Sequence, residues 1–512
     1  MKLNKERAHI YYTMGISAIS VFLNCFINLY LTPKITNSVG ADAYGFVSLA
    51  KNFVSYANII MTALNSYAAR YMTVAYIQKD EKKFKQYYNT VFFGDLFIGG
   101  VIFIVGITAT IFLEKLLNIP GHLILDVKIM FALTFLTFYI TTISTVFLAV
   151  GYVKDRLDLV NSIKGVSYIV EIVILVFTFI IFKPRVWYVG IALLMAAMVV
   201  FGGTVNLTNK LLPNSQLKIS AINKKAFKTL VVNGIWNSAN SMGNALNSGL
   251  DLLVSNLLLD ALSMGQVSIA KTINNMIYTI YATISQPFQP TFLKYFSSKD
   301  NKALLKELKY SMRVCGFVTN LIFAGFIVLG KDFYRLWIPT QNINLVYQLT
   351  VIAMLPCITE GCMYPIYYIY TLTIKNKVPC FITIAGGLLN VGGMVILLKY
   401  TRLGVYAIVI TTAIIMNGIN LIANPIYMSK CLKVKMGTFY PEIFLNIVAG
   451  VCAVLVMRVA VHVMPNQTSW LMFFMKGGIC VVVGILGQLM VLFRPAEIKR
   501  ITKKIIKRFR KI

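Results

Sequence analysis

Residues 44–51 read YGFVSLAK and residues 264–271 read MGQVSIAK, so five of eight positions are identical at an offset of 220 residues. The same offset places the pair Lys79-Asp80 on Lys299-Asp300. It also superimposes two sets of polar residues within apolar segments. Thr13, Ser17, Ser20, Asn24 and Asn28 correspond in this way to Asn233, Asn237, Asn240, Asn244 and Ser248. Three matches in one register predict that a half of the chain is duplicated.

Composition predicts an all-α polytopic membrane protein. Of the 512 residues 58% are hydrophobic and 13% are charged, about half the charged share of a soluble domain. Mean hydropathy is +0.72. Several apolar runs reach 18 residues, which is enough for a helix to cross a hydrocarbon core about 30 Å thick.

Counting these runs predicts about 14 transmembrane helices. They lie near residues 10–32, 44–76, 89–113, 127–150, 165–182, 187–208, 229–258, 263–293, 310–330, 346–373, 379–398, 403–428, 443–463 and 470–493. Six spans per half leave both halves in the same orientation, so we expect a pseudo-two-fold axis along the membrane normal. Spans 13 and 14 have no counterpart in the repeat.

The expected domain organisation follows from this count. Residues 1–208 form an N-lobe, 209–228 a cytoplasmic linker, 229–428 a C-lobe and 429–493 two accessory spans. The tail 494–512 is basic, with isoleucines at helical spacing. The tail is predicted to be either an interfacial helix on the inner leaflet or a basic segment that only fixes the membrane topology.

Lysine and arginine predict the orientation. With the N-terminus in the cytoplasm, 35 of the 49 basic residues fall in inside segments, 8 in outside segments and 6 within spans. This is the distribution of a protein with both termini cytoplasmic. The net charge of +31 is therefore explained by topology and anionic lipid, and we expect no nucleic-acid partner.

Span 7 carries an unusual polar stripe. Its members are spaced by three or four residues, which places them on one helical face: Asn233, Asn237, Asn240, Asn244, Asn247 and Asp251. Span 1 repeats the theme with Asn24 and Asn28. Amides facing lipid are costly, so the stripes either line a hydrated cavity that binds sugar hydroxyls or bond helix to helix.

Intramembrane charges are the second set of candidates. Lys51 and Lys271 lie about two turns inside spans 2 and 8, where they either hold a phosphate group or snorkel to the interface. Arg70 lies near the inner end of span 2. Candidate ion-coupling acids are Asp251, Asp95 and Glu360.

Signals for enzymatic chemistry are missing from the sequence. The three histidines are scattered, and there is no P-loop, nucleophile elbow or metal-binding histidine pair. The eight cysteines show no disulfide or metal-ligand spacing. We expect neither catalytic residues, metal nor cofactor.

Fourteen spans in a 6+6+2 arrangement resemble the polysaccharide transporter family, the O-antigen and capsule repeat-unit flippases of the multidrug/oligosaccharidyl-lipid/polysaccharide export superfamily. The stretch LTPKITNSVGADAYGFVSLAKNF (31–53) is similar to the family's connection between spans 1 and 2, with Pro33, Gly40, Tyr44 and Gly45 filling its proline and glycine positions. Arg70 matches a basic residue that the family often has late in span 2.

The resemblance implies alternating access through a cationic cavity in a bacterial inner membrane. The implied cargo is an undecaprenyl-pyrophosphate-linked oligosaccharide for O-antigen (lipopolysaccharide) or capsule biosynthesis. Lys51 and Lys271 are then expected to hold the pyrophosphate and the asparagines to meet sugar, with a polymerase or chain-length machinery as a possible partner. The polyprenyl tail is expected in a groove formed with spans 13 and 14.

Two alternatives stay open. One is a MATE-type multidrug or cation antiporter, which shares the 6+6 core but needs an acidic cavity. The other is a membrane enzyme such as a polysaccharide polymerase or acyltransferase. The related lipid II flippases carry an arginine-rich first and second span, whereas span 1 here, GISAISVFLNCFINLYL, has no arginine. That difference argues against a peptidoglycan precursor as cargo.

Overall fold

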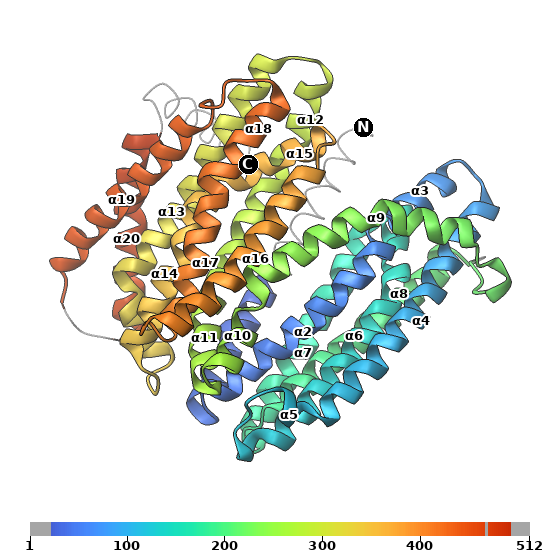
Figure 1. The fold of residues 1–512 in the computed structure, drawn as a ribbon, viewed down its shortest axis with the longest axis horizontal. Coiled ribbons are helices and arrows are strands. Elements are labelled where there is room, and N and C mark those ends of the chain that lie inside the picture. The colour runs from blue at the N-terminus through green and yellow to red at the C-terminus, as the bar shows by residue number, and fades with distance from the viewer. Residues whose placement is uncertain (1–21, 214, 466–468, 493–512) are drawn as a thin grey trace. The chain divides into compact units, whose positions relative to one another are not determined.

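The computed structural model describes residues 22–213, 215–465 and 469–492, and within them the chain is helical with no β-strand (Figure 1). The predicted all-α fold is therefore confirmed. Thr13, Ser17, Ser20 and the predicted tail at 494–512 lie outside the described residues.

Contacts divide the chain into two compact units. Unit 1 comprises residues 1–269 and 383–405, and unit 2 comprises 270–382 and 406–512. Two helices, α11 (Ala261–Ser285) and α16 (Lys377–Tyr400), therefore contribute to both units.

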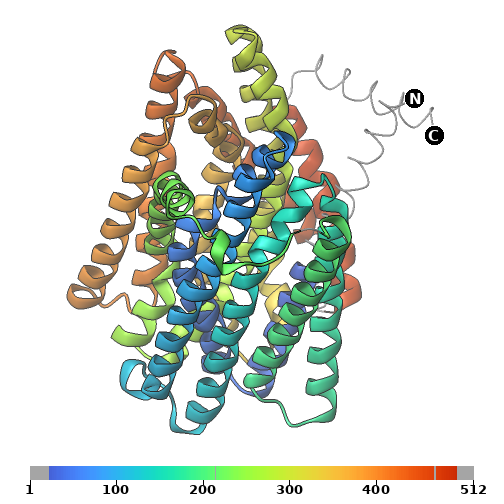
Figure 2. The same ribbon diagram turned by 90° about the vertical axis from the view of Figure 1, so that its right-hand side faces the viewer.

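Unit 1 opens with a helix through residues 22–38. Its remaining elements are α2 (Ala41–Asn65), α3 (Ala68–Ile77), α4 (Glu81–Ile111), α5 (Leu113–Leu116), η1 (Gly121–Leu123), α6 (Ile124–Val153), α7 (Leu157–Ile181), α8 (Trp187–Leu211), η2 (Ile219–Ala221), α9 (Lys224–Asn244), η3 (Ala245–Gly249) and α10 (Asp251–Leu258). The helices α4, α6 and α8 run side by side, and α2 packs along α9 (Figures 1 and 2).

Unit 2 continues from α11. Its further elements are η4 (Gln286–Phe288), α12 (Gln289–Ser297), α13 (Asn301–Trp337), α14 (Ile343–Met363), η5 (Tyr364–Tyr367), α15 (Tyr368–Leu372), α17 (Tyr406–Gly418), η6 (Ile419–Ala423), α18 (Asn424–Leu432), α19 (Tyr440–His462) and α20 (Trp470–Leu492). Here α13 packs against α14, and α14 against α17, which repeats the α4–α6–α8 order of unit 1.

The helix bounds follow the sequence repeat. Both ends of α2 and α11 lie 220 residues apart, and the starts of α4 and α13 and of α7 and α16 show the same offset. The helix α6 is matched by α14 with α15 at an offset of 219. The spacing seen in three short motifs therefore extends over five pairs of helices, when α8 and the α17–α18 segment are included.

One repeated turn shows why the motif Lys-Asp occurs twice. Lys79 and Lys299 both have φ 56°, the left-handed conformation that ends a helix. Asp80 and Asp300 then cap the next helix, each accepting a backbone N–H bond from the residue three positions on, at 3.0 and 2.9 Å. Lys79-Asp80 therefore ends α3 and begins α4, and Lys299-Asp300 ends α12 and begins α13.

Ten of the described helical segments are long and apolar enough to cross a membrane. They coincide with predicted spans 3–6 and 9–14. The other four predicted spans, near 10–32, 44–76, 229–258 and 263–293, are helical where the structure describes them, apart from turns at residues 66–67 and 250. These four segments carry the polar stripes and the paired lysines, which lower their apolar character.

The predicted lobes divide the chain sequentially, and that division stays a prediction. The compact units group the helices in another way, because α9, α10 and most of α16 pack within unit 1. A tight side-chain bond illustrates this grouping: the Asn390 amide of α16 donates to the Asn247 carbonyl at 2.7 Å.

The last two helices, α19 and α20, pack against α13. Arg313 of α13 donates to both carboxylate oxygens of Glu442 on α19, at 2.7 and 3.0 Å. About two turns further along α13 and one turn further along α19, the Asn320 amide donates to the Asn446 carbonyl at 2.7 Å. Helix α20 packs against both α13 and α19 (Figure 1). These contacts hold α19 and α20 in unit 2.

Candidate functional site

The repeated motif YGFVSLAK/MGQVSIAK is explained by a contact between its two copies within unit 1. The Ser268 hydroxyl donates to the Ser48 hydroxyl at 2.6 Å. A Cβ added at Gly45 would lie 2.9 Å from the Gly265 nitrogen, and one added at Gly265 would lie 2.1 Å from the Ala41 carbonyl. Only glycine permits this crossing, because a side chain at either position would overlap backbone atoms of the other segment.

The two lysines follow this crossing by one turn. Lys51 is partly exposed on α2 and interacts electrostatically with Glu171 of α7, a side chain that is 5% exposed. Lys271 is also partly exposed, on the part of α11 that belongs to unit 2. Neither lysine is fully buried, and Lys51 has Glu171 as an acidic neighbour, a pairing that the sequence did not specify.

The asparagine stripe of span 7 does not continue as one face. Asn233, Asn240 and Asn244 are exposed on α9 and Asn237 is partly exposed. The π-helical turn η3 then inserts one residue into the helical repeat, which rotates all later side chains. The prediction of a single face therefore fails after Asn244.

Within and after that turn the polar side chains of Asn247 and Asp251 are buried in unit 1. Asn247 is 3% exposed, and its amide donates to the carbonyls of Gly243 and Thr383 at 2.9 and 2.6 Å. Asp251 is 2% exposed. Asn247 therefore joins α9 to α16 as a structural bond.

The π-helical turn also releases a backbone carbonyl. The Gly249 oxygen accepts hydrogen bonds from the Tyr56 hydroxyl and the Asn52 amide, at 2.5 and 3.0 Å. Both donors lie on α2, so α2 satisfies the group that the irregular helix exposes.

The polar residues of span 1 lie in the same unit. Asn24 is exposed and Asn28 is partly exposed on the helix through residues 22–38, where the Asn28 amide donates to the Asn24 carbonyl at 3.0 Å. The Asn24 side chain also bonds to Tyr168 of α7, which neighbours Glu171. Asn24, Tyr168, Glu171 and Lys51 therefore form one polar group in unit 1.

Two further predicted residues are placed apart from this group. Asp95 is fully buried on α4 and accepts a hydrogen bond from the Asn65 amide at 2.9 Å. Arg70 is exposed on the short helix α3, beyond the break that ends α2 at Asn65.

Unit 2 contains a polar cluster that sequence reasoning located only at Glu360. We call it the tyrosine–glutamate cluster, and it consists of Tyr278, Tyr281, Glu360 and Tyr364. The Tyr281 side chain bonds to the Glu360 carboxylate. The hydroxyls of Tyr278 and Tyr364 lie 3.2 Å apart.

Helical spacing was the signal that could have found it. Asn274, Tyr278 and Tyr281 recur at steps of four and three on α11, and Cys357, Glu360 and Tyr364 at steps of three and four from α14 into η5. The two faces meet where the Cys357 thiol donates to the Asn274 side-chain oxygen at 2.7 Å.

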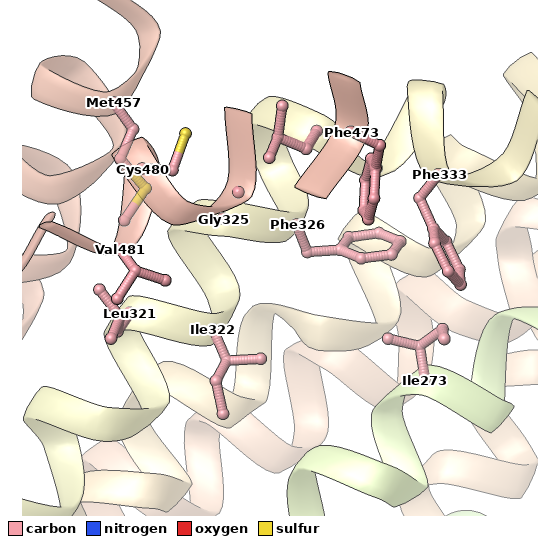
Figure 3. A pocket seen from close by; sticks show the side chains of 13 residues that line it. Ile273, Leu321, Ile322, Gly325, Phe326, Phe333, Met457, Phe473, Cys480 and Val481 are labelled. Carbon is pink, nitrogen blue, oxygen red and sulfur yellow. The ribbon is translucent and has the colours of Figure 1, made fainter. Parts of the chain in front are cut away.

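Unit 2 also holds an apolar pocket of about 300 Å³ (Figure 3). It is walled by α13, α19 and α20, with Ile273 of α11 at its edge. Its side chains include Ile322, Phe326, Phe333, Met457, Phe473 and Val481. A pocket lined in this way suits a hydrocarbon group rather than a polar one.

No group of histidine, cysteine and acidic side chains among the described residues is arranged to hold a metal ion. The candidate sites in the described residues are the polar group around Lys51, the tyrosine–glutamate cluster and the apolar pocket.

A relative of similar length matches the chain in sequence. No protein-family model matches the chain. The uncharacterized membrane protein EpsK of Bacillus subtilis (strain 168) is 25% identical over 461 residues, covering 90% of this chain and 91% of the relative.

Solved structures with the same fold are transporters. The lipid II flippase MurJ in its inward closed conformation has a TM-score of 0.67 at 14% identity and covers 93% of this chain and 99% of its own. An inward-facing multidrug resistance MATE family transporter of the MOP superfamily has a TM-score of 0.64 at 11% identity, covering 83% and 99%. A MOP superfamily transporter from Pyrococcus furiosus has a TM-score of 0.60 at 12% identity, covering 83% and 96%.

The chain therefore has the fold of the MOP superfamily and is a multi-pass membrane protein.

Proposed function

We propose that the protein is a flippase that moves oligosaccharides linked to undecaprenyl pyrophosphate from the inner to the outer leaflet. The observation that carries this proposal is the apolar pocket walled by α13, α19 and α20, because a polyprenyl tail needs a hydrocarbon-lined path. The share of this chain that the flippase MurJ covers, 93%, also exceeds the 83% covered by the MATE transporter.

The charged head of the cargo is assigned to the lysines. Lys51 and Lys271 are partly exposed residues within the predicted spans, and phosphate is a suitable partner for the point charge of a lysine. Arg70, exposed on α3, is proposed to meet the pyrophosphate near the inner surface. Glu171 neutralises Lys51 while no phosphate is bound.

The glycan is assigned to the exposed amides. Asn24, Asn233, Asn240 and Asn244 offer both donors and acceptors to sugar hydroxyls. Asn28 and Asn237 are partly exposed beside them. Asn247 is excluded from this role by its burial.

Coupling to an ion is assigned to the intramembrane acids. Asp95 and Asp251 are buried in unit 1, and Glu360 is partly exposed in unit 2. The proposal places the protein in the inner membrane with both termini in the cytoplasm. Its pathway is O-antigen or capsule biosynthesis, and its partner is a polymerase or chain-length machinery.

A gene deletion tests the function. Lipid-linked oligosaccharide is measured on each face of the membrane, and sensitivity to cationic drugs is measured in the same strain. Repeat units stranded on the cytoplasmic face, with loss of surface glycan, are expected. Normal surface glycan with sharply increased drug sensitivity would contradict the flippase proposal and favour a MATE-type antiporter.

Lys51→Ala tests the phosphate site. Loss of a hydrogen bond to a charged group weakens binding by about 1.5–3 kcal/mol, roughly tenfold or more, so transport should fall by that factor at normal protein levels. Because Lys51→Ala leaves Glu171 without its partner, Lys51→Ala with Glu171→Gln is measured beside it. The matched control is Lys399→Ala, which removes an exposed lysine at the end of α16. Transport at the control's rate in the double variant would contradict the assignment.

A further inference from the structure

The tyrosine–glutamate cluster lies midway along two predicted spans of unit 2. Tyr278 is near the centre of the span at 263–293, and Glu360 near the centre of the span at 346–373. Many helical transporters bind their cargo near the midplane of the bilayer.

The cluster has a supported side and an open side. Tyr281 is 2% exposed and holds the Glu360 carboxylate, whereas Tyr278 is 45% exposed. Glu360 and Tyr364 are partly exposed beside it. A partly exposed acid at mid-membrane depth is costly against lipid, which favours a polar path along this face.

Neighbouring bonds fix the supported side. The Thr359 hydroxyl donates to the Asn417 side-chain oxygen at 2.9 Å, and the Tyr367 hydroxyl to that of Asn420 at 2.6 Å. These bonds tie α14 and η5 to α17 and η6, so the rings and the carboxylate are held before any ligand arrives. Pre-organised groups lose less entropy on binding.

The open side offers two kinds of contact. The rings of Tyr278 and Tyr364 lie 5.7 Å apart at 89°, an edge-to-face pair, so ring faces and edges are presented in different directions. The face of an aromatic ring is negative and attracts the weakly positive C–H groups of a pyranose. A carboxylate accepts hydrogen bonds from hydroxyls.

We propose that the tyrosine–glutamate cluster is a carbohydrate subsite in which one tyrosine of the Tyr278–Tyr364 pair stacks its face on a sugar ring of the cargo, the other borders that ring, and Glu360 accepts hydrogen bonds from the sugar hydroxyls. This inference rests on the proposed flippase function and names the part of the cargo that unit 2 recognises. Because a second carboxylate beside Glu360 is repelled, the sugar bound here is neutral or carries an amine and is not a uronic acid.

The test compares two lipid probes bound to the full-length protein in lipid nanodiscs. One probe is undecaprenyl pyrophosphate without sugar. The other is the lipid-linked oligosaccharide purified from membranes of the deletion strain. Dissociation constants are measured for the wild type, Tyr278→Ala, Tyr278→Phe, Tyr364→Ala and Lys51→Ala.

The expected result separates the sugar from the pyrophosphate. Tyr278→Ala and Tyr364→Ala should weaken the glycosylated probe by roughly fivefold to tenfold and leave the sugar-free probe unchanged. Tyr278→Phe should bind like the wild type, because the ring is kept. Lys51→Ala should weaken both probes.

The control is Tyr440→Ala, which removes a tyrosine 36% exposed in unit 2 but outside the cluster. Unchanged binding of the glycosylated probe by both alanine variants, or equal loss for both probes, would overturn the carbohydrate subsite while the flippase proposal stands. Binding of neither probe by the wild type would overturn the proposed function and the subsite with it.

Discussion

Removing Arg313 is expected to detach the accessory helices from unit 2. Its guanidinium makes two bonds to Glu442, at 2.7 and 3.0 Å, and the two side chains are 19% and 6% exposed. Arg313→Met leaves the buried carboxylate uncompensated, which costs about 3–5 kcal/mol. Neutralising both partners with apolar residues of similar size is close to neutral, so Arg313→Met with Glu442→Leu should recover most of that loss.

The assay follows unfolding of the purified protein in detergent for the wild type, both single variants and the double variant. We expect a large loss of stability in Arg313→Met and a much smaller loss in the double variant. Because α19 and α20 wall the apolar pocket, transport should fall with stability in the single variant and return in the double variant. A double variant as unstable as Arg313→Met, or a single variant as stable as the wild type, would refute this reasoning.

Two further predictions concern unit 1. Ser48→Cys with Ser268→Cys should form a disulfide, because the hydroxyls lie 2.6 Å apart. Cross-linking should stop transport if α2 and α11 must separate, and a reductant should restore it; full transport by the cross-linked protein would contradict a moving contact. Asn240→Leu with Asn244→Leu should lower cargo affinity by about 1 kcal/mol, roughly fivefold, for each lost bond at unchanged stability. Asn247→Leu should instead lower stability, because it removes the amide that donates to the Gly243 and Thr383 carbonyls, at about 1 kcal/mol for each bond, and a melting temperature equal to that of the wild type would count against its structural role.

Much of the fold was accessible from local patterns. The offset of 220 residues between two eight-residue motifs predicted a duplication, and the helix bounds follow it. Lys79-Asp80 and Lys299-Asp300 marked equivalent turns because ending one helix and capping the next needs only neighbouring residues. The candidate lysines were found because a charge inside an apolar run is visible without any knowledge of its partner.

The candidate sites were only partly accessible. The asparagine steps of three and four predicted one face, but η3 changes the helical repeat and buries Asn247 and Asp251. A π-helical turn depends on bonds from another helix, here from Asn52 and Tyr56 to the Gly249 carbonyl. That dependence cannot be read from the stripe itself.

The sequence by itself determined that this is a helical membrane protein with a repeated set of spans. Hydrophobicity, helical period and capping act over a few residues, so they are legible along one chain. Only the tertiary structure decided which side chains meet: Glu171 with Lys51, Tyr281 with Glu360, and α19 and α20 with α13 around an apolar pocket. These encounters join segments that are distant in sequence, and their partners are selected by packing, which no local pattern records.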